Sequence, residues 1–144
     1  MTQGRPADLM EVGEELAPFE FTVTPELNQQ YLYAEEDFHP RYLETTEAGP
    51  PLVHPALLLN MSNTTRSPSF FLSPGLGAIH AGEQTTFIKP ARVGGTFRVT
   101  WKIIEKFEKR GRLYHVREAI MFDEQGQKIL SRLLTATFSS GKSA

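Results

Sequence analysis

Four residues in the first half of the sequence have side chains suited to acid–base chemistry: Asp37, His39, Tyr42 and His54. A carboxylate can remove a proton from water, and an imidazole exchanges protons near neutral pH. A phenol is a much weaker acid than an imidazolium, so Tyr42 is better suited to hold a water or a substrate oxygen. On residue type alone, Asp37 is more simply a solvated loop acid or a cap, the histidines are structural, and Tyr42 covers the sheet.

Several other kinds of chemistry are excluded or disfavoured. The sequence has no cysteine, which excludes disulfides, a thiol nucleophile and a thiolate metal site. Asp37, His39 and His54 match no standard metal-ligand spacing, so we expect no metal and no cofactor. A Ser-His-Asp hydrolase would need a Gly-x-Ser-x-Gly turn, which does not occur in the sequence. The formal net charge of −2 argues against a nucleic-acid-binding surface.

The length and composition indicate one globular domain. The chain has 144 residues, of which 40% are hydrophobic and 22% are charged, values that exclude a disordered or fibrous chain. No apolar run approaches the roughly 18 residues of a membrane span, and the polar residues 1–8 have no signal-peptide core. We therefore expect a cytoplasmic protein that does not enter a membrane.

The elements that must position the acid–base residues follow from sequence patterns. Alternating apolar residues predict a strand that ends at Val23, and Thr24-Pro25 predicts a short helix running to about Ala34. Residues 35–51 form a loop with several turn formers, and the apolar segment 52–61 is typical of a helix buried on several sides. After a second loop, four long strands are predicted: 79–88, 96–108, 113–123 and 128–139.

This order predicts an α+β domain, in which a curved antiparallel sheet wraps around the central buried helix. The predicted domain covers residues 15–140. A loosely held N-terminal arm, residues 1–14, precedes it, and a short tail, residues 141–144, follows it.

Residues 34–44, followed by Gly49-Pro50-Pro51-Leu52-Val53-His54, resemble the MaoC-like hydratases and dehydratases, which have the hotdog fold. That family carries Asp-x-Asn-Pro-x-His and then a Val-His-Gly that opens the central helix. Residues 89–96 and the last two hairpins also look like the N-terminal-type MaoC subfamily. The resemblance extends over residues 15–139 and implies a single hotdog domain.

The resemblance also implies roles for individual residues. Asp37 would be the general base that removes a proton from water, and His39 or His54 would be the second proton-handling group. Tyr42 would orient the substrate or the water. Three further residues would contact the substrate: Phe38, Pro55 and Ala56.

Three positions depart from the family pattern. His39 stands at the signature asparagine, Tyr42 at the signature histidine, and Pro55 at the glycine after Val-His. In the family, a backbone N–H at the start of the central helix holds the thioester oxyanion, and proline has no such N–H. The N–H of Ala56 or His54 could replace it only if the helix start is shifted.

Two functions therefore remain open at the level of sequence. The first is an acyl-thioester hydro-lyase of fatty acid metabolism, of the 2-enoyl-CoA hydratase or 3-hydroxyacyl-CoA dehydratase type, acting on a CoA or acyl-carrier thioester. The second is a non-catalytic acyl-CoA-binding subunit that pairs with a catalytic MaoC-like subunit. The resemblance implies a homodimer or a hetero-pair with another hotdog subunit, with the site at the shared interface. Another hotdog activity, such as a thioesterase, is a third alternative.

Some weaker signals stand outside these assignments. His80 and His115 fall on predicted strands, where a structural role is the simpler interpretation. Residues 70–72 either cover the core or line an acyl tunnel. Three basic residues have the chemistry to hold CoA phosphates: Lys89, Arg92 and Arg98.

Overall fold

The computed structural model describes residues 4–140, so the predicted tail and the first three residues of the predicted arm lie outside the described part. Five strands form one antiparallel sheet in the order β1-β3-β4-β5-β2. Their bounds are β1 (Glu15–Thr22), β2 (Gly77–Phe87), β3 (Thr96–Lys109), β4 (Arg112–Phe122) and β5 (Lys128–Ser139). The four long strands predicted from the sequence are present, with ends that differ by a few residues at most. β3, β4 and β5 form a meander, but β2 pairs with β5 rather than with β3, so a meander of all four strands, expected from their order, is wrong.

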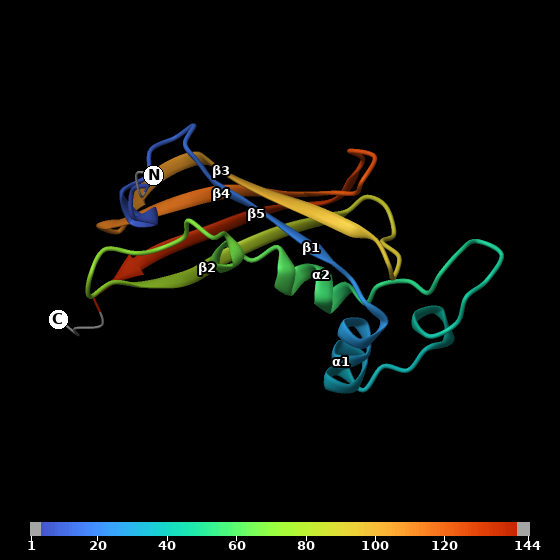
Figure 1. Ribbon diagram of the computed structural model, residues 1–144. Helices are drawn as coiled ribbons and strands as arrows, with labels where there is room; N and C mark the ends of the chain where they lie inside the picture. The colour runs from blue at the N-terminus through green and yellow to red at the C-terminus, as the bar shows by residue number, and fades with distance from the viewer. Residues whose placement is uncertain (1–3, 141–144) are drawn as a thin grey trace.

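A central helix, α2 (Pro55–Met61), lies against one face of the curved sheet (Figure 1). Its Leu57 and Leu58 are buried together with Trp101 of β3 and Met121 of β4. The indole N–H of Trp101 donates to the carbonyl oxygen of Ser62 at 2.9 Å, which ties the sheet to the C-terminal end of α2. The predicted α+β arrangement of a sheet around a buried helix is confirmed.

The first helix, α1 (Pro25–Glu35), begins and ends as its sequence predicts. The hydroxyl of Thr24 accepts a hydrogen bond from the backbone N–H of Leu27 at 3.1 Å, and proline fits the first helical position. The helix ends where Glu36 adopts a left-handed conformation, with φ 52°. This residue turns the chain and brings the following loop back towards α2.

The helix α2 begins at Pro55, three residues later than the sequence predicts. Leu52 pairs with Arg92 in an isolated β-bridge, and the N–H of Val53 donates to the carbonyl oxygen of Ala91 at 2.8 Å. These bonds hold the segment before Pro55 extended. Proline then opens the helix, because an N–H at that position would have no helical partner.

The N-terminal arm also differs from its prediction. Ala7 and Met10 are buried in the core, and the N–H of Ala7 donates to the carbonyl oxygen of Phe71 at 2.7 Å. The carboxylate of Asp8 accepts hydrogen bonds from the N–H and the hydroxyl of Ser73, at 2.8 and 2.7 Å. Residues 4–14 are therefore packed rather than loosely held, because apolar contacts and distant hydrogen bonds fix them.

None of the helices within residues 4–140 has both the length and the apolar character needed to cross a bilayer.

Candidate acid–base site at the start of the central helix

Asp37 and His54, which are 17 residues apart in sequence, form a pair in the structure. The Nε2 atom of His54 lies 3.1 Å from Oδ2 of Asp37. Asp37 follows the turn at the end of α1, and its backbone N–H donates to the carbonyl oxygen of Leu32 at 3.0 Å. His54 is the residue before α2. The ends of the two helices thus bring together the two strongest acid–base candidates of the sequence.

The hydrogen bonds of His54 determine which of its ring nitrogens carries the proton. Its Nδ1 accepts a hydrogen bond from the backbone N–H of Ala56 at 3.0 Å. In the neutral ring, Nε2 must then carry the hydrogen, and it donates this hydrogen to Asp37. The imidazole is therefore held at both nitrogens, and Nδ1 has no free lone pair to act as a base.

The Asp37 carboxylate accepts a second hydrogen bond, from the backbone N–H of His39 to Oδ1 at 3.2 Å. This N–H lowers the pKa of Asp37 below its usual value, partial desolvation opposes the shift, and the His54 hydrogen bond adds to it. The side chain is 40% exposed. Asp37 is therefore an ionised, solvent-reachable carboxylate at neutral pH.

A buried asparagine on α1 holds this arrangement and was not identified from the sequence. The Oδ1 atom of Asn28 accepts the backbone N–H of His54 at 3.0 Å. Its Nδ2 donates to the carbonyl oxygens of Tyr42 and Leu52, at 3.3 and 3.4 Å. Asn28 lies one helical turn before the buried Leu32. A polar residue on the apolar face of a short helix was the signal that could have identified it.

The side chains of Tyr42 and His39 lie beside the pair but make no hydrogen bond to Asp37 or to the His54 ring. The ring centroids of Tyr42 and His54 are 4.9 Å apart, so the phenol ring covers the imidazole. The exposed His39 ring instead receives hydrogen bonds from Arg41, at 3.1 Å from both the backbone N–H and Nε of that residue. His39 therefore caps a short turn, while its backbone rather than its ring contacts Asp37.

The three predicted substrate contacts have different surroundings. Pro55 lines a cavity, whereas the Ala56 N–H is bound by His54. The exposed ring of Phe38 packs edge-on against Tyr33, with centroids 5.2 Å apart. Only Pro55 of these three residues lines that cavity.

A cavity near the pair has a volume of about 350 Å³, within the range of small-molecule sites, but neither Asp37 nor His54 lines it. Tyr42 and Pro55 line it together with apolar residues of α2, of the end of β2 and of the chain that follows β2, among them Leu58, Phe87 and Ile88. Of the basic residues proposed to hold phosphates, Lys89 lines this cavity and pairs with Asp123 at 3.1 Å. Arg92 donates to the carbonyl oxygen of Pro50 at 2.7 Å.

The start of α2 offers no free backbone N–H in its first turn. Pro55 has none, the N–H of Ala56 donates to His54, and the N–H of Leu57 donates to the carbonyl oxygen of His54 at 3.0 Å. The N–H of His54 itself is held by Asn28. An oxyanion at this helix start would have to displace one of these bonds.

Within residues 4–140, no group of three or more His, Asp or Glu side chains is arranged to hold a metal ion.

Comparison with known proteins supports the fold. No protein family model matches the sequence, and no curated protein matches it. Among solved structures, a monoamine oxidase regulatory protein from Archaeoglobus fulgius aligns with a TM-score of 0.79 and 19% identity, over 95% of this chain and 97% of that one. The R-hydratase PhaJ1 from Pseudomonas aeruginosa aligns with a TM-score of 0.76 and 19% identity, over 96% of this chain and 91% of that one. A MaoC-like dehydratase from Rhodospirillum rubrum aligns with a TM-score of 0.73 and 13% identity, over 93% of this chain and 96% of that one.

A two-chain assembly has the same fold. The HadBC complex, a 3R-hydroxyacyl-ACP dehydratase from Mycobacterium tuberculosis, aligns with a TM-score of 0.65 and 14% identity, over 92% of this chain and 99% of that one. At such identities these likenesses establish the hotdog fold, which confirms the prediction from the sequence.

Proposed function

We propose, from the hotdog fold that this chain has in common with MaoC-like dehydratases and R-hydratases, that it is an acyl-thioester hydro-lyase of that family. The observation that carries the proposal is the contact of 3.1 Å between His54 and Asp37, near an apolar cavity that Tyr42 and Pro55 line. The substrate would be a 2-enoyl or 3-hydroxyacyl thioester of CoA or of an acyl-carrier protein. We place this reaction in the cytoplasm, as expected from the sequence.

The ionised Asp37 is the base in this proposal. One proton of a water passes to its carboxylate while the water oxygen bonds to C3 of the enoyl chain. The electrons of the C2–C3 double bond move towards the thioester oxygen, and C2 then takes the proton back from Asp37, which regenerates the carboxylate. His54 holds Asp37 in position through its Nε2 hydrogen, and Tyr42 orients the water or the substrate.

A specific observation favours the second candidate, a non-catalytic acyl-CoA-binding subunit. All backbone N–H groups in the first turn of α2 are already bonded, so the thioester oxygen has no ready donor there. Losing one oxyanion donor costs about 10²–10³-fold in rate in a well-studied hydrolase. In this alternative, the chain holds or completes the acyl tunnel of a catalytic partner.

Either function is compatible with pairing through strand β2. This edge strand is exposed along nearly its whole length, and Ile79 and Phe87 are 44% and 52% exposed. Long exposed edge strands are normally covered or paired. The HadBC complex is an example of two chains assembled in this fold. We therefore propose a homodimer or a hetero-pair with another hotdog chain.

The test is the hydration of short, long and branched trans-2-enoyl-CoA esters by the purified chain, followed by loss of the conjugated-thioester absorbance. We expect turnover, and we expect Asp37→Asn to lower kcat/KM by about 10²–10⁴-fold, because the base is removed. Glu35→Gln, at an exposed acid two residues earlier, is the matched control and should keep full activity.

An absence of turnover with all of these esters would overturn the self-sufficient enzyme. Equilibrium dialysis with butyryl-CoA then tests the second candidate, which requires binding without conversion. If the chain neither hydrates nor binds these thioesters, both functions are wrong.

A further inference from the structure

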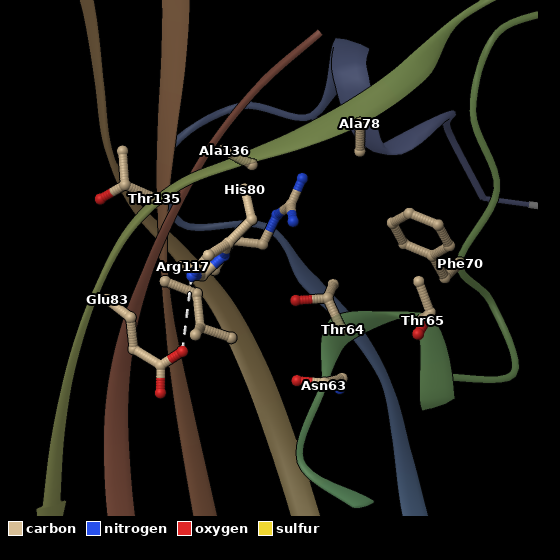
Figure 2. A pocket seen from close by; sticks show the side chains of 11 residues that line it. Asn63, Thr64, Thr65, Phe70, Ala78, His80, Glu83, Arg117, Thr135 and Ala136 are labelled. Atoms are coloured by element: carbon tan, nitrogen blue, oxygen red, sulfur yellow. Dashed lines mark ion pairs between the residues drawn. The ribbon is translucent and has the colours of Figure 1, made fainter. Parts of the chain in front are cut away.

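A second cavity lies beyond the C-terminal end of α2, away from Asp37. Its volume is about 410 Å³, and its wall includes Asn63 and Thr64 after α2, Ala78 and His80 of β2, and Arg117 of β4 (Figure 2). Figure 2 shows the Arg117 side chain extending into the space bounded by Ala78, Phe70 and Thr64. None of the residues given a role at the first site lines this cavity.

Arg117 is buried without hydrogen-bond partners for most of its charged group. The residue is 3% exposed, and its Nε and Nη2 atoms have no partner within residues 4–140. The guanidinium carbon lies 6.0 Å from the ring centroid of Phe70 and 5.7 Å from that of Phe138. Ring faces stabilise a cation, but they do not satisfy its N–H donors.

The charges around this cavity leave one cation uncompensated. Glu83, the acid in its wall, is bound by Arg132, with Oε2 lying 2.8 Å from Nη2 and 3.1 Å from Nε. His80 reaches the other oxygen of Glu83 at 3.5 Å. His115 is fully buried, and burial, followed by the charges of Lys106 and Arg117, lowers its pKa to about 4, so it is neutral at pH 7.

We propose that this cavity binds a small organic monocarboxylate, whose carboxylate pairs with the guanidinium of Arg117 and whose apolar body packs against Phe70. This site is independent of the hydro-lyase proposed above. One uncompensated positive charge matches one carboxylate, and a hydrogen bond between a guanidinium and a carboxylate is charge-assisted and therefore strong.

The remaining wall fits an amphipathic ligand better than a free inorganic anion. Leu134, Ala78 and Ala136 contribute apolar surface, and Thr64 and Thr135 contribute hydroxyl groups. Arg117 offers one positive charge and Glu83 is already paired, so a second negative charge on the ligand would have no cation to pair with. A monoanion with a short hydrocarbon chain therefore satisfies the cavity, whereas a dianion such as phosphate does not.

Butyrate is the probe for this site, and butyramide is its uncharged counterpart. Isothermal titration of the purified chain should show binding of butyrate and none of butyramide or inorganic phosphate. Arg117→Met should weaken butyrate binding by about 10- to 100-fold, because a charge-assisted hydrogen-bonded pair is lost. Arg117→Lys should retain part of it. Arg112→Met, at an exposed arginine of the same strand, should bind as the wild type does.

Three outcomes would overturn the proposal. Butyrate binding could be absent, or it could be as strong in Arg117→Met as in the wild type. Alternatively, Arg117→Met could weaken self-association in analytical ultracentrifugation while butyrate has no effect, which would mean that a carboxylate of a second copy pairs with Arg117. Thermal melting of each variant verifies that it is folded. The enoyl-CoA assay has no bearing on these outcomes, so the two proposals fail separately.

Discussion

Two buried arginines on neighbouring strands have opposite surroundings. Arg132 of β5 is 4% exposed and Arg117 of β4 is 3% exposed. Arg132 donates to the carbonyl oxygen of Leu59 at 2.7 Å and to Oδ1 of Asn63 at 3.1 Å, and it pairs with Glu83. Two of the three guanidinium nitrogens of Arg117, in contrast, have no hydrogen-bond partner within the described residues.

This difference shows that burial alone does not tell whether a charged side chain stabilises the fold or binds a ligand. Arg132 donates to the Leu59 carbonyl oxygen in the last turn of α2, and Glu83 neutralises it, so its role is structural. Among the described residues, Arg117 has two aromatic rings around it and no paired anion, and burial lowers its pKa to about 10, so its charge is costly to keep. A costly charge next to a cavity indicates a binding site.

The largest effect is expected from Arg132→Met. The substitution leaves Glu83 without the guanidinium that pairs with it and removes the 2.7 Å hydrogen bond to the Leu59 carbonyl oxygen, which keeps only a longer one from the Ser62 hydroxyl. Removing one partner of a buried pair costs about 3–5 kcal/mol, and because Glu83 is partly exposed we expect a loss at the lower end of this range. Urea denaturation of the variant should show this decrease in the free energy of unfolding. A loss below about 1 kcal/mol would mean that the hydrogen bonds of Arg132 do not stabilise the fold.

The pH dependence of stability should report on His115. Burial lowers its pKa from 6.5 to about 4, so the unfolded chain binds a proton on this residue between these values and the folded chain does not. Its contribution is therefore fully present above pH 6.5 and is lost as the pH falls towards 4. The shift corresponds to about 3 kcal/mol.

The measurement is urea denaturation at pH 7 and pH 4 of the wild type and of His115→Leu. The variant should lose about 3 kcal/mol less than the wild type over this interval, since leucine does not titrate. His80→Leu, at an exposed histidine, is the control and should follow the wild type closely. Equal losses in the wild type and His115→Leu would show that His115 is solvated.

The smallest effect is expected from Arg117→Met, and it has the opposite sign to that of Arg132→Met. Replacing a buried, unpaired charge with an apolar side chain of similar length should stabilise the ligand-free protein by about 2 kcal/mol. The melting temperature would rise by several degrees for a chain of this size. A destabilised Arg117→Met would mean that Arg117, like Arg132, is a satisfied structural cation.

The sequence predicted the elements well because their signals are local. Thr24-Pro25 fixes the start of α1 through a side-chain cap and a proline at the first helical position. The alternation of apolar and polar residues along the last four strands is an equally local signal, since successive side chains of a strand point to opposite faces of the sheet. The start of α2 was predicted too early, because the bridge between Leu52 and Arg92 that keeps this segment extended joins distant residues.

The candidate site was predicted in part. Asp37 and His54 were identified by residue type and by resemblance to the MaoC-like family, and the structure brings them into contact. The occupation of His54 Nδ1 by the Ala56 N–H, and the role of Asn28, were not predicted. Both depend on how the ends of α1 and α2 meet, which no local pattern specifies.

The sequence by itself determined the class of the domain, the order of its elements and the side chains available for chemistry. It also determined that His115 and Arg117 lie on the same face of β4, because a strand has a period of two. Only the tertiary structure decided which polar groups have partners. The contacts that satisfy Arg132 span up to 73 residues, and those that would satisfy Arg117 do not form. Hydrogen bonding depends on distances between atoms, and only the packing of distant segments fixes those distances.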